Sequence, residues 1–270
     1  MTETVEAARL TKKGRATKER IVSAAADLIF EYGVAGTSIE DVRKAAGVSG
    51  SQMAHYFHDK RRLVIDVVGH QADVVVRLHR QPEMGRLDSF ADLRHWADLH
   101  VQRQIERGCT GGCDFGSLAG ELVESDGDTR QQLASGFDRW EGVLREGLQA
   151  MYDRGDLRPE ADPEKLATTL LATLQGGLLL TQTKRDPAPL ATALDSTLTY
   201  IESFATDPAS VRTNRTSAGG PAADPRSARP APADAASALP TSPDSTSAEA
   251  ASDDPAAAAP ESGGRWGRNG

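Results

Sequence analysis

The chain has 270 residues, of which 39% are hydrophobic and 26% charged, and its formal net charge is −8. This composition predicts one or two globular domains and excludes a chain that is disordered throughout. The first ten residues contain no apolar core segment, and polar residues interrupt Leu166 to Leu180, the most apolar stretch. We therefore expect no signal peptide, no transmembrane helix and a cytoplasmic protein that does not bind membranes.

The charge is unevenly distributed along the sequence. Residues 1–80 hold 13 lysines and arginines against 10 acidic residues, residues 81–206 hold 12 against 21, and residues 207–270 hold 6 against 8. A basic N-terminal part on an acidic body is compatible with DNA contact at one end only, because salt screens the attraction of phosphates beyond about 8–10 Å. Ordinary variation of surface charge is the alternative interpretation.

The N-terminal region begins with a basic segment and an amphipathic helix. Residues 1–14 are expected to form a flexible basic arm. The helix predicted from Lys18 to Tyr32 ends at Gly33, a residue that suits a left-handed helix terminus. Its apolar stripe is Ile21, Ala25, Leu28, Ile29 and Tyr32. The cations that either add nonspecific affinity for DNA or are simply solvated are Lys12, Lys13, Arg15 and Lys18.

A second helix is predicted from Ile39 to about Ala46. Thr37 and Glu40 have the spacing of a capping box at its start, and Gly47 ends it. Val48 is expected to fill the core beneath the turn that follows.

A third, short helix begins with a second capping signature, formed by Ser49 and Gln52, and ends at Phe57. Two helices joined by such a short glycine-containing turn are typical of a DNA-binding helix-turn-helix. Asp59 is expected to cap a longer helix from Lys60 to about Leu78.

The third helix has two chemically different faces. At about 100° per residue, Met53 and Phe57 lie on one side and are expected to pack against the first two helices. The residues expected to face a DNA groove are Gly50, Ser51, Gln52, His55 and Tyr56. Gln can pair bidentately with adenine, Ser and His can reach base edges or phosphates, and Tyr can bind a phosphate oxygen. The alternative for Gln52 is that it only closes its capping box with Ser49.

These residues resemble the TetR family of bacterial repressors over about Thr17 to Val76. The matching segments are Thr37 to Val42, Ala45 to Ser49 and His55 to Phe57, followed by Lys60 and Leu63. The resemblance implies an all-α protein, with an N-terminal three-helix helix-turn-helix DNA-binding domain at residues 15–76. A helical ligand-binding and dimerisation domain at residues 77–206 and double-stranded DNA as the partner are implied with it.

The resemblance also implies roles for single residues. Those expected at phosphates are Thr37, Ser38, Tyr56 and Lys60, and those expected at bases are Ser51, Gln52 and His55, with Ser49 and Gly50 at the start of the same helix. Ala54 stands where the family usually places a phosphate-binding tyrosine, so that contact is missing or passes to Tyr56. For Lys60 the alternative is a solvated lysine beside a helix cap.

Five helices are predicted in the body, and the last two carry leucine stripes. Their ranges are Phe90 to Arg107, Phe115 to Glu124, Thr129 to Arg154, Pro163 to Thr183 and Pro189 to Ala205. The stripes are Leu166, Leu170, Leu174 and Leu178, then Leu190, Leu194, Leu198 and Ile201. Two such helices from each subunit are expected to build a four-helix dimer interface, with Gly176 and Gly177 allowing close approach. The alternative is that both stripes face the core of their own subunit.

A ligand cavity is expected between the middle helices. The candidates for lining it are Trp96, His100, Phe115, Trp140, Met151 and Gln175, although each also suits a plain core position. The loop from Cys109 to Leu118 is rich in glycine, and its two cysteines are expected to be thiols in a reducing compartment. Zinc sites need four well-spaced ligands, so no metal or other cofactor is expected.

We therefore expect a homodimeric repressor that a small apolar or amphipathic molecule releases from a palindromic operator. The alternatives are an activator, a regulator without a ligand, a thiol-responsive regulator using Cys109 and Cys113, and a scaffold that binds through its acidic tail. The nucleophile-elbow, phosphate-loop and zinc-protease motifs are absent from the sequence, so no enzymatic activity is expected. Residues 207–270, rich in Ala, Pro, Ser and Asp, are expected to be disordered.

Overall fold

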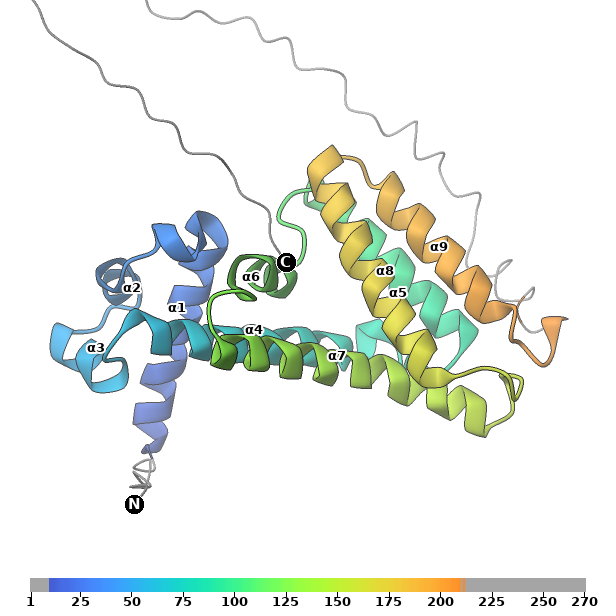
Figure 1. Ribbon diagram of the computed structural model, residues 1–270, viewed down its shortest axis with the longest axis horizontal. Helices are drawn as coiled ribbons and strands as arrows, with labels where there is room; N and C mark the ends of the chain where they lie inside the picture. Colours follow the sequence, from blue (N-terminus) through green and yellow to red (C-terminus); the bar gives the residue numbers. More distant parts are fainter. Residues whose placement is uncertain (1–9, 210, 212–270) are drawn as a thin grey trace, which may run out of the picture. The chain divides into compact units, whose positions relative to one another are not determined.

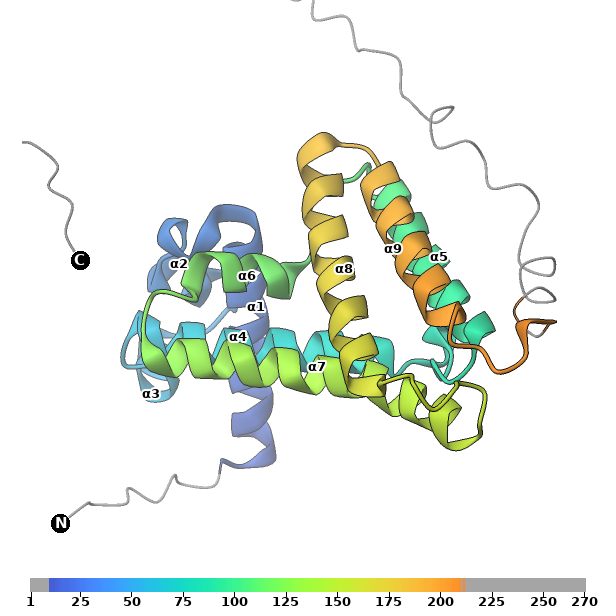
Figure 2. The same ribbon diagram turned by 45° about the vertical axis from the view of Figure 1, so that its right-hand side comes forward.

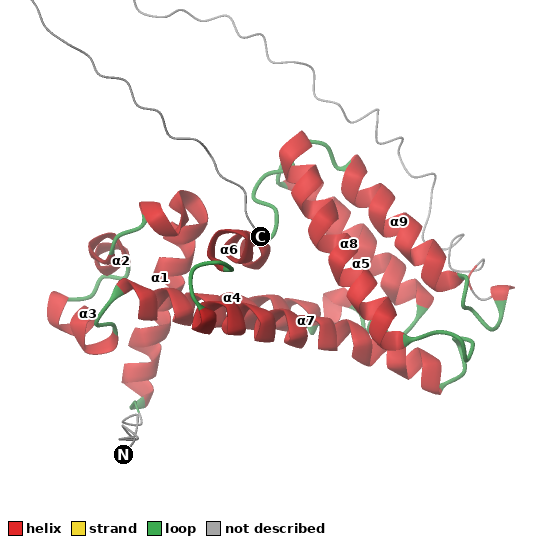
Figure 3. Ribbon diagram, viewed as in Figure 1, coloured by secondary structure: helices red, strands yellow, loops and turns green. Residues whose placement is uncertain are grey.

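A computed structural model describes residues 10–209 and 211 of the chain. Within these residues it contains α-helices, one short 3-10 helix and no strand, so the predicted all-α fold is confirmed (Figure 3). In chain order the elements are α1 (Lys12–Gly36), α2 (Ile39–Ala45), α3 (Gly50–Tyr56), α4 (Lys60–His79), η1 (Pro82–Met84), α5 (Phe90–Glu106), α6 (Asp114–Leu122), α7 (Gly127–Asp153), α8 (Pro163–Lys184) and α9 (Ala188–Glu202). Most of the predicted basic arm and of the predicted disordered tail lies outside the described residues. No helix in the described part is both long and apolar enough to cross a membrane.

The helices α1, α2 and α3 form a three-helix unit at the N-terminal end (Figure 1). Its core contains Ile21 from α1, Val42 from α2 and Met53 from α3, all buried. Gly47 has a φ of +61° in the turn between α2 and α3, a conformation that favours glycine. Val48 is buried beneath this turn, as the sequence predicted.

Helix α1 is longer than predicted. It begins at Lys12 rather than Lys18, so the end of the expected flexible arm is helical. Gly33 has a φ of +73° and interrupts the helix, as predicted, but one more turn follows to Gly36. Tyr32 is 57% exposed, so its predicted place in the buried stripe is wrong. The last turns of α1 lie beside α6 and the loop before it. The periodicity of the sequence does not predict these contacts.

Each of the two short helices, α2 and α3, begins with a capping box. The predicted capping box of Thr37 with Glu40 is wrong by one residue, because Ser38 and Asp41 form it instead. The hydroxyl of Thr37 donates to the carbonyl of Gly33 at 2.9 Å and is therefore not available to cap α2. The predicted box at the start of α3, between Ser49 and Gln52, is confirmed.

The body is built on two long helices that run side by side, α4 and α7 (Figures 1 and 2). Helix α4 also packs on α1, so it connects the helix-turn-helix unit to the body. Asp59 caps α4 by accepting from the backbone of Arg62 at 2.7 Å, as predicted. Helix α8 packs on α7 and α9, and α9 packs on α5. The predicted boundaries of α4 to α9 lie within three residues of the observed ones.

The leucine stripes of α8 and α9 do not form a subunit interface. All eight residues, from Leu166 to Leu178 and from Leu190 to Ile201, are buried within this single chain. A Cβ atom added to Gly177 would lie 2.7 Å from Leu190, so this glycine permits the close approach of α8 and α9. The expectation that the stripes face a second subunit is therefore wrong, because the two helices and their neighbours α5 and α7 already cover them.

Candidate nucleic-acid interface and ligand cavity

Helix α3 presents a polar face to solvent. Its buried side holds Met53, and Phe57, the residue that follows the helix, is buried with it; both are 2% exposed. The exposed residues of the helix include Gly50, Ser51, Gln52 and His55. A short helix fixed by two apolar anchors, with polar side chains opposite, is the arrangement by which a recognition helix enters the major groove.

The start of α3 is ordered by reciprocal hydrogen bonds between Ser49 and Gln52. The Ser49 hydroxyl accepts from the backbone N–H of Gln52 at 3.2 Å, and the Gln52 side-chain oxygen accepts from the backbone N–H of Ser49 at 2.9 Å. The hydroxyls of Ser49 and Ser51 lie 3.0 Å apart. A bidentate contact with adenine uses both ends of the amide, so Gln52 would have to leave its capping box to make one.

The four residues expected at phosphates lie in different surroundings. Thr37 is 4% exposed, and its hydroxyl is bonded to Gly33. The Ser38 hydroxyl caps α2 and also donates to the Asp41 carboxylate at 2.5 Å. Tyr56 is half-buried, with its ring edge-on to His55, and Lys60 is a half-exposed residue at the start of α4. Lys60 and Tyr56 therefore remain the better placed candidates, whereas Thr37 is better explained as a structural residue.

Two basic residues of α1 have structural partners. Lys18 pairs with Asp66 at 2.5 Å and lies over the ring of Phe57, so it is not part of a free arm. Arg20 donates to the backbone oxygen of Ala46 at 3.0 Å and thereby ties α1 to the end of α2. These contacts tie α1 to α4, to the end of α2 and to Phe57, the residue that follows α3.

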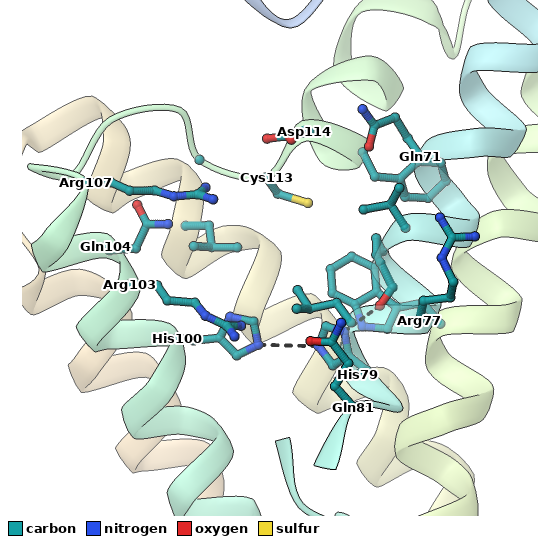
Figure 4. Close-up of a pocket in the computed structure, with 17 residues that line it drawn as sticks. Gln71, Arg77, His79, Gln81, His100, Arg103, Gln104, Arg107, Cys113 and Asp114 are labelled. Atoms are coloured by element: carbon teal, nitrogen blue, oxygen red, sulfur yellow. Dashed lines mark hydrogen bonds between the residues drawn. The ribbon is translucent and has the colours of Figure 1, made fainter. Parts of the chain in front are cut away.

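A cavity of about 490 Å³ lies among α4, α5, α7 and the N-terminal end of α6 (Figure 4). Three of the six predicted ligand residues line it: His100, Phe115 and Trp140. Gln175 lines a neighbouring cavity, where its amide donates to the sulfur of Cys113 at 3.6 Å. Trp96 and Met151 are fully buried core residues and line neither of these cavities.

Two histidines meet at the floor of this cavity. His79 Nδ1 lies 2.8 Å from the carbonyl oxygen of Val75 and must donate to it, since a carbonyl only accepts. In neutral His79 the other nitrogen, Nε2, is then an acceptor, and His100 Nε2 donates to it across 3.3 Å (Figure 4). Burial lowers the pKa of His79 to about 4 and also lowers the pKa of His100 well below its usual value. Both rings are therefore neutral near pH 7.

Three arginines of the cavity were not predicted from the sequence. Arg77 reaches the cavity from α4, while Arg103 and Arg107 reach it from α5 and its C-terminal cap. The signal was present in α5, where the inward positions change from Leu93 and Trp96 to polar residues after one further turn. Those polar residues are His100, Arg103, Gln104 and Arg107, spaced as one face of a helix.

The two cysteines lie on the loop that leads into α6. Cys113 caps this helix by accepting from the backbone of Gly116 at 3.3 Å. Burial raises the pKa of both Cys109 and Cys113, so both remain protonated thiols near neutral pH. The thiolate is the reactive form of cysteine, and the surroundings therefore give no support to thiol sensing. Among the described residues no group of three or more His, Cys, Asp or Glu side chains is arranged to hold a metal ion.

Comparison with known proteins places these features in a family. Residues 21–67 match the sequence model described as bacterial regulatory proteins, tetR family, and residues 89–197 match the one described as tetracyclin repressor-like, C-terminal domain. An uncharacterized HTH-type transcriptional regulator of Lactococcus lactis subsp. lactis is 28% identical over 189 residues, which cover 70% of this chain and 94% of the relative. The HTH-type transcriptional repressor DhaR of Mycobacterium sp. (strain GP1) is 21% identical over 64% of this chain and 86% of its own length. The crystal structure of a TetR transcriptional regulator from Chloroflexus aurantiacus J-10-FL has a TM-score of 0.59 and 27% identity, covering 71% of this chain and 96% of that one.

Proposed function

Because this chain belongs to the TetR family of bacterial transcriptional regulators, we propose that it is a homodimeric repressor that a small molecule releases from a palindromic operator. Binding of DNA through the helix-turn-helix is the function that the family carries. The repressor mode, the dimer and the ligand are the parts that we add. Its place of action is then the cytoplasm, where the operator is.

The observation that carries the proposal is the exposed face of α3. Ser51, Gln52 and His55 project from a helix that Met53 and Phe57 fix to the unit beneath it. We assign phosphate contacts to Tyr56, Lys60 and the cap residue Ser38, and base contacts to Ser51, Gln52 and His55. Gly50 has open space around its Cα, so the backbone there can approach DNA closely.

The dimer that we propose uses the outer faces of α8 and α9, opposite their leucine stripes. Leu179, Leu180 and Tyr200 are 63%, 47% and 53% exposed, and a surface that gathers several large apolar side chains is typical of a protein–protein interface. Gly176 has open space on the same side of α8, so a second helix can approach it closely. A two-fold dimer can read a palindromic site when its two α3 helices lie about 34–36 Å apart or a multiple of it, and this is the spacing that we expect.

Release requires that the ligand bind one arrangement of the dimer better than the other, by about 1–3 kcal/mol. The position of the cavity supports release by a ligand, because two of the helices that line it also contact α1 of the helix-turn-helix unit. Its wall includes α4, which packs on α1, and the N-terminal end of α6. The far end of α6 carries Glu121, whose carboxylate accepts from the backbone of Val34 in α1.

The test is to sequence the genomic fragments that the purified protein retains and to measure transcription from the adjacent promoter in a deletion strain. We expect a two-fold symmetric consensus and higher transcription on deletion. Lower transcription would indicate an activator instead. Retained fragments without a common sequence would contradict the assignment of α3 as a reading helix.

A further inference from the structure

We propose that the cavity among α4, α5, α6 and α7 binds a small amphipathic carboxylate. Its carboxylate would pair with Arg103 and Arg107, and its apolar part would lie against Val75, Phe115 and Trp140. This inference rests on the proposed function and names the chemical class of its effector.

The cavity gathers positive charge within an acidic body. Residues 77–206 hold 14 lysines and arginines against 21 acidic residues, yet the lining contains Arg77, Arg103 and Arg107 against a single carboxylate, Asp114. The two histidines of the lining are neutral, as shown above, so they do not change this balance. The lining therefore has a net charge of +2 near neutral pH, which favours an anion.

These three arginines differ from most others of the body in having no ion pair among the described residues. Arg80, Arg139 and Arg154, by contrast, each pair with a carboxylate at 3.0 Å or less. The Arg103 guanidinium makes only a weak 3.9 Å contact with the sulfur of Met84. Figure 4 shows Arg103 and Arg107 extending from α5 into the space between the helices. Guanidinium groups in this position can bind a carboxylate with paired, charge-assisted hydrogen bonds.

Two buried polar groups of the lining also lack a partner. Trp140 is 2% exposed, and its Nε1 donor has no hydrogen bond within the structure. Gln104 is 4% exposed, and its side-chain oxygen is likewise unpaired. A buried group without a partner costs free energy, so a polar ligand at this position would be stabilising. The amide of Gln104 can turn to present either its donor or its acceptor to that ligand.

Apolar side chains from four helices form much of the remaining wall, beside Gln71, Gln81 and Cys113. Its apolar members are Val74, Val75 and Leu78 of α4, Phe115 of α6, Trp140 of α7 and Leu178 of α8. A volume of about 490 Å³ lies within the usual range for small-molecule sites. Asp114 lies at the edge of the same cavity and would repel a second negative charge, which favours a monoanion over a phosphate monoester.

The experiment is calorimetric titration of the full-length protein, without DNA, by four probes with the same eight-carbon chain: octanoate, octanamide, octylammonium and octyl phosphate. Hydrogen bonds to charged groups predict that octanoate binds about 10- to 100-fold more tightly than octanamide. Octylammonium should bind more weakly than either. The proposal would be overturned if octanoate does not bind or binds no more tightly than octanamide. It would also be overturned if octyl phosphate or octylammonium binds more tightly than octanoate.

Variants test which residues hold the anion. Arg103→Gln and Arg107→Gln should each weaken octanoate binding by about tenfold and leave octanamide binding unchanged. Arg130→Gln, on the exposed side of α7, removes the same charge outside the cavity and should change neither. Asp114→Asn should strengthen octanoate binding, because it removes the competing carboxylate. Unchanged octanoate affinity in both arginine variants, or weaker binding in Asp114→Asn, would contradict the assignment.

The outcome is separable from that of the proposed function, because these titrations contain no operator. If octanoate binds as expected but does not change operator occupancy, the anion site stands and release of the operator through this site is wrong. If the protein binds its operator and a neutral or cationic molecule releases it, the proposed function stands and the carboxylate class is wrong.

Discussion

The carboxylate of Glu121, in α6, accepts a hydrogen bond of 2.9 Å from the backbone N–H of Val34, in the last turn of α1. Gly33 breaks the helix immediately before Val34, so a new turn of helix begins there, and the first N–H groups of a turn need a cap. The same carboxylate oxygen accepts from Ala35 at 3.4 Å. Glu121, in α6, therefore caps the last turn of α1 and ties the body of the chain to the three-helix N-terminal unit.

Glu121→Ala should release this turn. We expect faster hydrogen exchange at Val34 and Ala35 and a loss of about 0.5–2 kcal/mol in the free energy of unfolding, the range typical of a lost helix cap. Glu124→Ala is the matched control, since Glu124 is an exposed glutamate just beyond the same helix. Unchanged exchange at Val34 in the Glu121 variant would show that the contact does not hold α1.

Lys60→Ala should weaken binding to every DNA sequence by a similar factor. A lysine at a phosphate displaces about one counterion, so the slope of log affinity against log salt should fall by about one unit. Affinity is measured between low and physiological salt on a selected duplex and on random DNA. A slope that does not change would identify Lys60 as a solvated residue beside the Asp59 cap.

Gln52→Ala separates base reading from capping. If Gln52 contacts a base, preference at one position of each half-site should change by about 1–3 kcal/mol. If it only closes the capping box with Ser49, all sequences should lose affinity equally and the protein should lose about 1 kcal/mol of stability. Competition among duplexes that differ at single positions distinguishes the two results. We expect the first.

The buried pair His79 and His100 predicts acid sensitivity. The pKa of His79 in the folded protein, about 4, lies below the ordinary value of 6.5, so the unfolded chain binds more protons between these values. The free energy of unfolding should therefore be highest above pH 6.5. It should fall by roughly 3 kcal/mol from His79 alone as the pH approaches 4. Denaturant titrations at several pH values measure this loss.

A double variant, His79→Leu with His100→Leu, should have a flatter dependence of stability on pH over the same range. His58→Gln, which removes an exposed histidine outside this pair, is the matched control. An equally steep loss of stability in the double variant would assign the acid sensitivity to other groups.

Leu179→Arg should dissociate the proposed dimer without unfolding the subunit. The side chain is 63% exposed in the single chain, so a charge there is tolerated until a second subunit covers it. Sedimentation analysis should show monomers, with helical content unchanged. Ile105→Arg, at another exposed apolar residue, should remain dimeric. Dimers in the Leu179 variant would place the interface elsewhere.

The sequence was sufficient for the helices and for the two faces of α3, because both follow from local periodicity and caps. It was insufficient where a choice depends on tertiary neighbours. The stripe from Leu166 to Leu178 is equally compatible with a subunit interface and with a core, and only the packing of α8 against α7 and α9 shows that it is core.

The cap of α2 and the polar lining of the cavity also depend on tertiary neighbours, so neither could be predicted from local sequence alone. Thr37 with Glu40 and Ser38 with Asp41 have the same spacing, and the bond from Thr37 to Gly33 determines which pair forms the box. The polar positions of α5 suggest a solvated surface when α5 is considered alone. They line a cavity because α4 and α7 lie opposite, close enough for His100 to meet His79.

The most direct test of α3 as a reading helix is a competition titration of the full-length protein at physiological salt. A fluorescent duplex chosen from the retained genomic fragments competes with unlabelled random DNA. Specific recognition predicts that the selected duplex binds at least about 1,000-fold more tightly than the random competitor. Equal affinity for the two would contradict sequence reading by Ser51, Gln52 and His55, and with it the proposed function.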